Sequence, residues 1–141
     1  MALSCNEVEF AEQRSAIRAV REAVFIQEQG VPESLEMDDR DMACKHALLK
    51  LDNVPIGTGR IDIEKAGKVG RVAILGDHRN KGYGRIIMNQ LEATAQANGL
   101  NRIWFHAQIS ALPFYERLGY TSEGDLFEEA GIQHVKMTKV L

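Results

Sequence analysis

The sequence has little cysteine and no arrangement of it that indicates a metal or redox site. Its two cysteines, Cys5 and Cys44, are far apart, and no Cys-x-x-Cys pair is present. This spacing excludes a zinc knuckle, and we expect two reduced thiols. The four histidines show no metal-ligand spacing, and the run from Asp38 to Asp41 lacks the alternation and the glycine of a calcium loop. No metal is therefore predicted.

Long apolar runs are also missing. No segment approaches the roughly 18 consecutive apolar residues that a membrane-spanning helix needs. The first ten residues, MALSCNEVEF, have no basic region followed by an apolar core, so they do not read as a secretory signal. No membrane partner is predicted, and the cytoplasm is the expected location.

Neither sign of charge is in large excess. Against 20 Asp and Glu residues stand 17 Lys and Arg residues, which gives a formal net charge of −3 at pH 7. This balance argues against general binding of nucleic acid. The 45% hydrophobic and 26% charged residues of the 141-residue chain suit a folded protein with a true core. We expect one domain, residues 1–141.

Hydrophobic periodicity predicts alternating strands and helices. An amphipathic helix is expected over 10–30, after a short strand at 2–8, and an acidic loop follows it. Three strands are expected between 46 and 75, and Gly99 is the expected stop of a second helix. This order predicts an α+β fold with an antiparallel meander, βαβ crossovers and helices on the sheet. The remaining elements are a helix at 83–100, a strand at 101–109, a short helix at 110–120 capped by Ser110, and a strand at 132–141.

The segment HRNKGYGR, residues 78–85, opens the second helix. A helix N-terminus presents unpaired N–H groups and a positive dipole end, which bind phosphate. The lack of a Cβ at Gly82 and Gly84 would let an anion approach the backbone closely. Positive charge is added by Arg79, Lys81 and Arg85.

Two familiar phosphate-binding motifs do not match this segment. A P-loop needs Lys and then Ser or Thr after its last glycine, but Arg85 and an isoleucine follow Gly84. The dinucleotide fingerprint needs a third Gly or Ala where Ile87 stands. What remains is Arg-x-x-Gly-x-Gly, from Arg79 to Gly84, and an ordinary turn between strand and helix stays open as the alternative.

Several segments, in order, resemble the GCN5-related N-acetyltransferases (GNAT). GRVAIL is similar to the central strand of that family, GYGRIIM to its coenzyme-binding helix, and ALPFYERLGY to its C-terminal helix–strand motif. VREAVFIQEQGVP and EEAGIQHVKMTK resemble the small ElaA-like and YjcF-like branch. The resemblance implies the GNAT fold, a central mixed and mostly antiparallel sheet of about seven strands with helices on both faces. It also implies acetyl-CoA as cosubstrate.

The resemblance further implies where the coenzyme binds. Backbone N–H groups from about Lys81 to Arg85 would hold the pyrophosphate, with Arg79 beside them. The strand from Val72 to Leu75 would splay from the next strand and pair with the pantetheine, and the N–H of Ile74 would polarise the thioester carbonyl. The expected coenzyme contacts are Val72, Ile74, Arg79, Asn80, Lys81, Gly82, Tyr83, Gly84, Arg85, Phe114 and Tyr115.

Acetyl transfer to an amine requires a base for the amine and an acid for the leaving thiolate. By resemblance Tyr115 is the thiolate acid, and a half-buried packing tyrosine is the alternative. For the base, the candidates are Glu36 and Asp38 in the acidic loop, together with His46 and His134. The alternatives are a solvated acidic surface, for the loop acids, and structural histidines. Asp39 and Asp41 of the same loop are further candidates for the base, and Glu28 is a weaker one. Arg71, His106 and Gln108 are expected to orient the substrate.

The expected function is acetyl-CoA-dependent N-acetyl transfer to a small primary amine by direct attack in a ternary complex. The acidic loop could attract a cationic amine or a lysine-rich protein. Three alternatives stay open: an acyl-CoA-binding module without turnover, an acetyltransferase for protein lysines or N-termini, and an enzyme that transfers a longer acyl group. Sheet edges that pair could also make the protein a homodimer.

Overall fold

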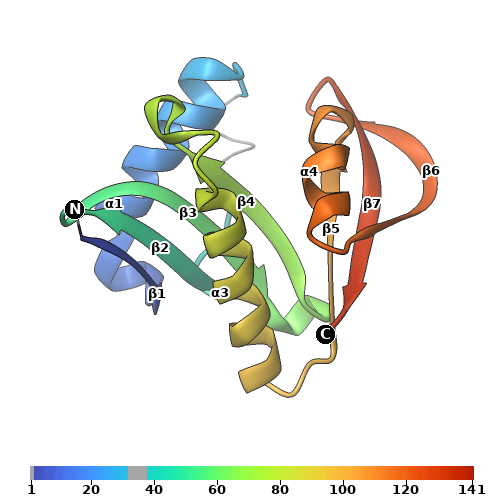
Figure 1. The fold of residues 1–141 in the computed structure, drawn as a ribbon, viewed down its shortest axis with the longest axis horizontal. Helices are drawn as coiled ribbons and strands as arrows, with labels where there is room; N and C mark the ends of the chain where they lie inside the picture. The colour runs from blue at the N-terminus through green and yellow to red at the C-terminus, as the bar shows by residue number, and fades with distance from the viewer. Residues whose placement is uncertain (1, 32–37) are drawn as a thin grey trace.

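A computed structural model describes residues 2–31 and 38–141 of the chain (Figure 1). Over these ranges the chain forms a seven-stranded sheet with the order β1-β2-β3-β4-β5-β7-β6. Its pairs are antiparallel except for β4 with β5, so the sheet is mixed and mostly antiparallel, as predicted. The strands are β1 (Leu3–Val8), β2 (Lys45–Leu51), β3 (Val54–Asp62), β4 (Lys68–Ile74), β5 (Arg102–Gln108), β6 (Thr121–Glu129) and β7 (Ile132–Val140). The helices are α1 (Phe10–Arg21), the π-helical η1 (Glu22–Glu28), α3 (Tyr83–Ala97) and α4 (Leu112–Arg117), with 3₁₀ turns η2 (Ile63–Lys65), η3 (Gly76–His78) and η4 (Ile109–Ala111).

Helices cover both faces of the sheet (Figure 1). Helix α1 lies behind β2, β3 and β4, whereas α3 crosses the front of the same strands and α4 lies in front of β5. The apolar positions predicted for the first helix, including Ile17 and Val20, are buried under the sheet. Helix α3 buries Ile87 and Leu91 in the same way, and Gly99 follows its end with φ +80°, as the predicted stop. None of the described helices combines the length and apolar character that a bilayer-spanning helix requires.

Two elements differ from the sequence-based expectation. Strand β6 was not expected, because it lies at the sheet edge and is exposed almost throughout, so no apolar alternation marks it. The predicted capping of the short helix by Ser110 is wrong. Ser110 belongs to η4, Ala111 occupies the N-cap of α4 without a side-chain hydrogen bond, and a proline in the first turn starts the helix.

A β-bulge interrupts β4 next to the centre of the sheet. Thr58 of β3 pairs with Ala73, but Arg60 pairs with Gly70, so β4 has one residue more than β3 between these two pairs. Arg71 lies in this interval and has a left-handed backbone, with φ +51°. An arginine has a Cβ and rarely adopts this conformation, so the surrounding pairs hold it there.

The bulge reverses which positions of β4 face α3. Val69, before the bulge, packs into the core beneath α3, and so do Val72 and Ile74 after it. A simple alternation along β4 therefore does not hold, since odd positions face α3 on one side of the bulge and even positions on the other.

Strands β4 and β5 separate soon after they begin. They are parallel, and the only register pair between them joins Lys68 to Trp104. Beyond that pair the two strands diverge towards their C-terminal ends (Figure 1). The splay expected at this place is confirmed. It leaves the backbone groups on the β5-facing edge of β4 without a strand partner, whereas the other edge stays paired with β3.

Candidate active site

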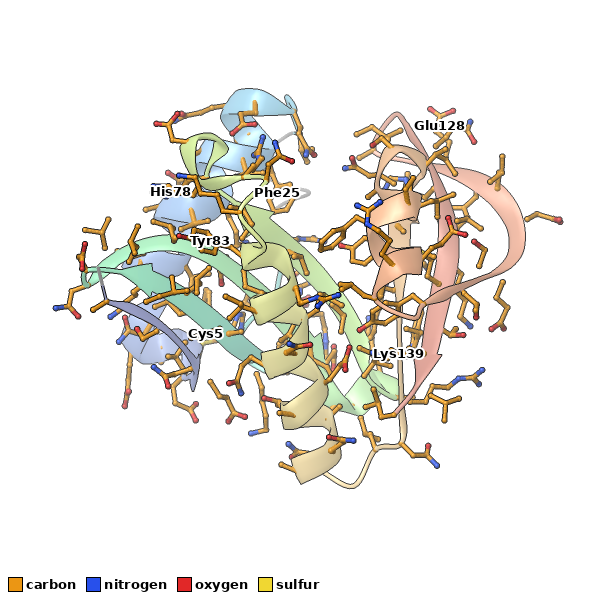
Figure 2. The ribbon with its side chains drawn as sticks, viewed as in Figure 1. Cys5, Phe25, His78, Tyr83, Glu128 and Lys139 are labelled. Atoms are coloured by element: carbon orange, nitrogen blue, oxygen red, sulfur yellow. The ribbon has the colours of Figure 1, made fainter. Side chains whose placement is uncertain are left out.

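A cavity of about 1030 Å³ lies where β4 and β5 diverge. Its walls come from both halves of the sheet, from the end of η1, from the segment before α3 and from α4. In Figure 2, Phe25 and His78 lie on the β4 side of this opening, and Glu128 lies on the opposite, C-terminal side. The topology therefore brings together segments that are far apart in the sequence.

The backbone of β4 offers hydrogen-bonding groups to this cavity. The N–H of Leu75 donates to the carbonyl of Ile56 in β3, over 2.9 Å. Because successive N–H groups of a strand point to opposite edges, the N–H of Ile74 points towards β5, where no strand pairs with it. The same alternation applies to Val72. Both placements suit the predicted pairing with pantetheine and the predicted contact of Ile74 with the thioester carbonyl.

The glycine segment reaches the same cavity at the start of α3. Asn80 and Gly82 have left-handed backbones, with φ +61° and +80°, and no atom lies within 4 Å of a Cβ built on Gly82. The first N–H groups of α3 have no partner within the helix and can bind an anion there. Of the predicted coenzyme contacts, Lys81 does not belong to the described lining of the cavity, and Val72, Ile74, Arg79, Asn80, Gly82, Tyr83, Gly84, Arg85, Phe114 and Tyr115 do.

Gly84 has a second reason to lack a side chain. A Cβ built on Gly84 would lie 2.8 Å from Cζ of Phe114, closer than packed atoms tolerate. The missing side chain at Gly84 therefore lets the first turn of α3 approach the Phe114 ring of α4.

The guanidinium of Arg79 already has partners on every nitrogen. Nε donates to the carbonyl of Ile74 over 2.9 Å, and the two terminal nitrogens bind the carboxylate of Glu28 at 2.8 and 3.0 Å. Arg79 thus connects the end of β4 and the end of η1 to the start of the glycine segment.

Tyr115 has the environment of a protonated hydrogen-bond donor. Its ring packs on Phe105 and Phe114, with centroids 4.5 and 5.0 Å apart, and it lines the cavity. Burial raises the pKa of Tyr115 to about 12, so the phenol keeps its proton at neutral pH. Its hydroxyl has no hydrogen-bond partner among the described residues and is available to a ligand.

Three histidines line the cavity, His78, His106 and His134, and the last two each have one ring nitrogen engaged. Nδ1 of His134 lies 2.7 Å from the carbonyl of Ile132. A carbonyl can only accept, so Nδ1 carries the hydrogen and the neutral ring has its lone pair on Nε2. Nδ1 of His106 lies 2.8 Å from the carboxylate of Glu129. His134 stands opposite Gln108 in the pairing of β5 with β7, which places both on one face of the sheet.

His46 is not part of this cavity as the described residues define it. It is 1% exposed, its Nε2 lies 2.8 Å from the carbonyl of Asp41, and its ring packs on Phe10 with centroids 5.0 Å apart. Burial lowers the pKa of His46, which favours the neutral ring. The predicted catalytic role of His46 is therefore replaced by a structural one.

Two acids of the loop before β2, Asp38 and Asp41, are paired with arginines. Both carboxylate oxygens of Asp38 accept from Arg60 at 2.7 Å, and one also accepts from Arg71 at 3.2 Å. The hydrogen bond from Arg60 is the main reason that the pKa of Asp38 lies well below its usual range. Asp41 binds Arg21 and Arg60, each at 2.8 Å. These carboxylates are poor bases and are not open to a cationic amine.

Glu36, the other acid predicted as a base, lies outside the described residues. The residues predicted to orient the substrate, Arg71, His106 and Gln108, all line the cavity. Gln108 donates through Nε2 to Oε1 of Gln29 over 3.2 Å and so joins β5 to the segment after η1. No cluster of three His, Cys, Asp or Glu side chains suited to a metal ion is found in residues 2–31 and 38–141.

Sequence reasoning missed several charged cavity residues, among them Arg60, Lys68 and Glu129. Arg60 carried a signal, since an arginine between apolar residues of a central strand requires a buried partner. Lys68 and Glu129 stand next to turns and resemble ordinary surface residues in the sequence.

Comparison with known proteins gives the family. The model of the acetyltransferase (GNAT) domain matches residues 7–141. The uncharacterized N-acetyltransferase YjcF of Bacillus subtilis is 39% identical over 123 residues, which is 85% of this chain and 87% of that protein. A protein of known structure from Lactobacillus plantarum is 30% identical and superposes with a TM-score of 0.89, covering 100% of this chain and 99% of its own.

Escherichia coli ElaA shares the fold at lower identity. It is 21% identical, with a TM-score of 0.86 over 98% of this chain and 99% of its own. The splayed strands, the glycine segment before α3 and the family match agree with one another. The chain is an acyltransferase that belongs to the GNAT acetyltransferase family.

Proposed function

We propose that the protein transfers the acetyl group of acetyl-CoA directly to a primary amine in a ternary complex. The observation that carries the proposal is the loss of strand pairing beyond Lys68 and Trp104, which opens the edge of β4 beside Tyr115 and the glycine segment. Pantetheine would pair with Val72 and Ile74 along this open edge. The pyrophosphate would bind the N–H groups at the start of α3.

The chemistry assigns a role to three groups. The amine nitrogen attacks the thioester carbonyl carbon, the new C–N bond forms, and the C–S bond breaks. The N–H of Ile74 stabilises the charge that develops on the carbonyl oxygen. Nε2 of His134 takes the proton from the amine, and the hydroxyl of Tyr115 gives a proton to the leaving thiolate.

His134 is the preferred base for two reasons. Its hydrogen bond to the Ile132 carbonyl fixes the tautomer with a free lone pair on Nε2. Its ring is also held by stacking on Phe127, with centroids 5.9 Å apart, so little reorganisation is needed. Proton transfer of this kind contributes about 10²- to 10⁴-fold. His134→Asn should therefore lower kcat by about that factor without changing the Kd of acetyl-CoA, and His106→Asn serves as the comparison.

The first test is thermal unfolding with acetyl-CoA, with free CoA and with NAD. A ligand that binds only the folded state at 100 times its Kd adds about 2.7 kcal/mol of stability. A clear rise of Tm with acetyl-CoA and none with NAD supports the coenzyme site. No rise at millimolar acetyl-CoA would remove the basis of the proposal.

The second test is release of CoA thiol in the presence of small amines. Thiol release that depends on the amine, together with an acetylated product found by mass spectrometry, supports transfer. Tight binding of acetyl-CoA with no thiol release for any small amine or peptide would instead favour an acyl-CoA-binding module. Release with peptides alone would favour the protein acetyltransferase alternative.

A further inference from the structure

The charges that line the described cavity are mostly positive. Its acidic side chains are Asp38, Asp62 and Glu129, whereas eight of its side chains are Lys or Arg. Three of the eight, Arg79, Arg85 and Arg117, belong to the segments around the proposed coenzyme site. The other five are Arg40, Arg60, Lys65, Lys68 and Arg71, on the side where an acceptor amine would enter.

The three acids of the lining already have basic partners. Asp38 accepts two hydrogen bonds from Arg60, as described above. Both oxygens of Asp62 accept from Arg40, at 2.8 and 2.9 Å. The carboxylate of Glu129 binds the ring of His106. An ammonium group that entered this side would have to displace a bound guanidinium or imidazole, and nothing described here would compensate the displaced charge.

Lys68 is the opposite case, a cation that no carboxylate of the described residues binds directly, although the charge of Glu129 acts on it at longer range. No hydrogen bond or ion pair joins its ammonium to any described residue, and the ammonium lies 5.4 Å from the centre of the Trp104 ring. Burial lowers the pKa of Lys68, which means that the charged form lacks full compensation in its surroundings. An anion beside Lys68 would supply that compensation.

Lys68 also stands at the place where the two strands separate. Lys68 is the first residue of β4 and forms the one register pair of this strand with β5, opposite Trp104. On β5, alternation puts His106 on the face of Trp104, and the intervening Phe105 faces Tyr115 on the other side. Lys68, Trp104 and His106 therefore share the sheet face that leads from the splay to the histidines.

We propose that the acceptor amine carries an anionic group, a carboxylate or a phosphate, and that Lys68 binds this group. This inference rests on the proposed function and names the class of its acceptor. It replaces the expectation, drawn from the acidic loop, of a polyamine or a lysine side chain. Apolar side chains at Val24, Phe25 and Val31 also line the cavity and suit an acceptor with an apolar part, such as an apolar amino acid.

The test compares matched acceptors at saturating acetyl-CoA, with thiol release as the readout. Leucine is compared with leucinamide, and O-phosphoethanolamine with ethanolamine, and putrescine represents cationic amines. The two members of a pair differ in the basicity of their amines. The quantity of interest is therefore the ratio of kcat/KM for the anionic over the neutral member, compared between variants, because the intrinsic difference then cancels.

Lys68→Gln should lower this ratio by roughly 10- to 100-fold, as expected for the loss of a charged hydrogen bond, mainly through KM. Lys68→Arg should retain most of the ratio. The matched control is Lys136→Gln, because Lys136 also lies over the Trp104 ring, at 4.9 Å, but is not part of the described cavity lining. It removes the same charge from the same aromatic ring and should leave the ratio unchanged.

Equal ratios in the wild type and in Lys68→Gln, or a preference for putrescine, would overturn the inference. The leucine pair and the phosphoethanolamine pair tell a carboxylate site from a phosphate site. If no amine releases thiol, the proposed function fails, and calorimetric titration of leucine and O-phosphoethanolamine into the CoA-bound protein then decides the inference. Binding that Lys68→Gln abolishes supports the anion site even then, and no binding of either probe contradicts it.

Discussion

Arg79 and Glu28 form a two-pronged ion pair that joins the glycine segment to the end of η1. Their side chains are each 40% exposed, so the pair itself contributes only about 0–1 kcal/mol to stability. Its main effect is positional, because the same guanidinium also holds the last carbonyl of β4, at Ile74. Arg79 thereby connects the glycine segment, residues 78–85, to the end of η1 and to the end of β4.

This connection predicts that Arg79 supports coenzyme binding indirectly, by holding the glycine segment in place. Glu28→Gln and Arg79→Gln should each weaken acetyl-CoA binding by a similar factor, about 3- to 10-fold. The double variant should be no weaker than the worse single one, since both changes break one unit. Isothermal calorimetry measures the three Kd values. A much larger loss in Arg79→Gln than in Glu28→Gln would show instead that Arg79 contacts the pyrophosphate directly.

The contact between Gly84 and Phe114 predicts a stability effect that is separate from coenzyme binding. Gly84→Ala should cost about 1–3 kcal/mol, because the new Cβ meets the Phe114 ring. Adding Phe114→Leu should recover part of this loss by making room. Urea unfolding of the two single variants and the double variant measures it. If the losses of unfolding free energy in the two single variants simply add up in the double variant, the strain does not arise from the contact of residue 84 with Phe114.

Gly82→Ala is the control for Gly84→Ala in that experiment. Nothing lies within 4 Å of a Cβ on Gly82, but its φ is +80°. Gly82→Ala should therefore cost only about 1 kcal/mol, from backbone strain, and Phe114→Leu should not relieve it.

Tyr115→Phe separates chemistry from binding. The phenylalanine ring keeps the packing on Phe105, so stability and the Kd of acetyl-CoA should change little. The loss of the proton donor should lower kcat by about 10²- to 10⁴-fold. Since burial raises the pKa of Tyr115 to about 12, the wild-type donor should stay protonated up to at least pH 10. An unchanged kcat would remove Tyr115 from the mechanism.

The ion pair of Asp38 with Arg60 predicts how stability depends on pH. Arg60 lowers the pKa of Asp38 in the folded state, whereas an unfolded Asp titrates near about 3.9. The group therefore stabilises the fold above that value, and this contribution is lost as the pH falls from about 5 towards the lowered pKa. Asp38→Asn should cost about 1–3 kcal/mol at pH 7 and less at pH 3.

Urea unfolding at a series of pH values from 7 to 3 measures this difference. Asp39→Asn is the control, because Asp39 is exposed and is not one of the carboxylates that form an ion pair with Arg60. A cost for Asp38→Asn that does not fall with pH would mean that packing, and not the charge, accounts for it.

Local patterns in the sequence determined much of the architecture and one half of the site. The apolar spacing of α1 and α3 and the turns of the meander follow from side-chain periodicity and backbone preferences, which are local properties. The segment from Arg79 to Arg85 and the motif around Tyr115 are continuous in the chain, so they could be identified and assigned to a coenzyme. The exposed strand β6 could not be predicted, because its residues are not buried and therefore show no apolar alternation.

The acceptor side was decided only by the tertiary structure. A sequence gives the charge of Asp38 or His46 but not its partners, and the partners determine the protonation state. The pairing of Asp38 with Arg60, the burial of His46 against Phe10 and the contact of the Lys68 ammonium with the Trp104 ring all join residues that are distant in the chain. The bulge at Arg71 is likewise a property of the pairing of two strands. Sequence alone therefore determined the family and the segment that we propose to bind the coenzyme, and long-range packing decided which of the described charges are paired with one another.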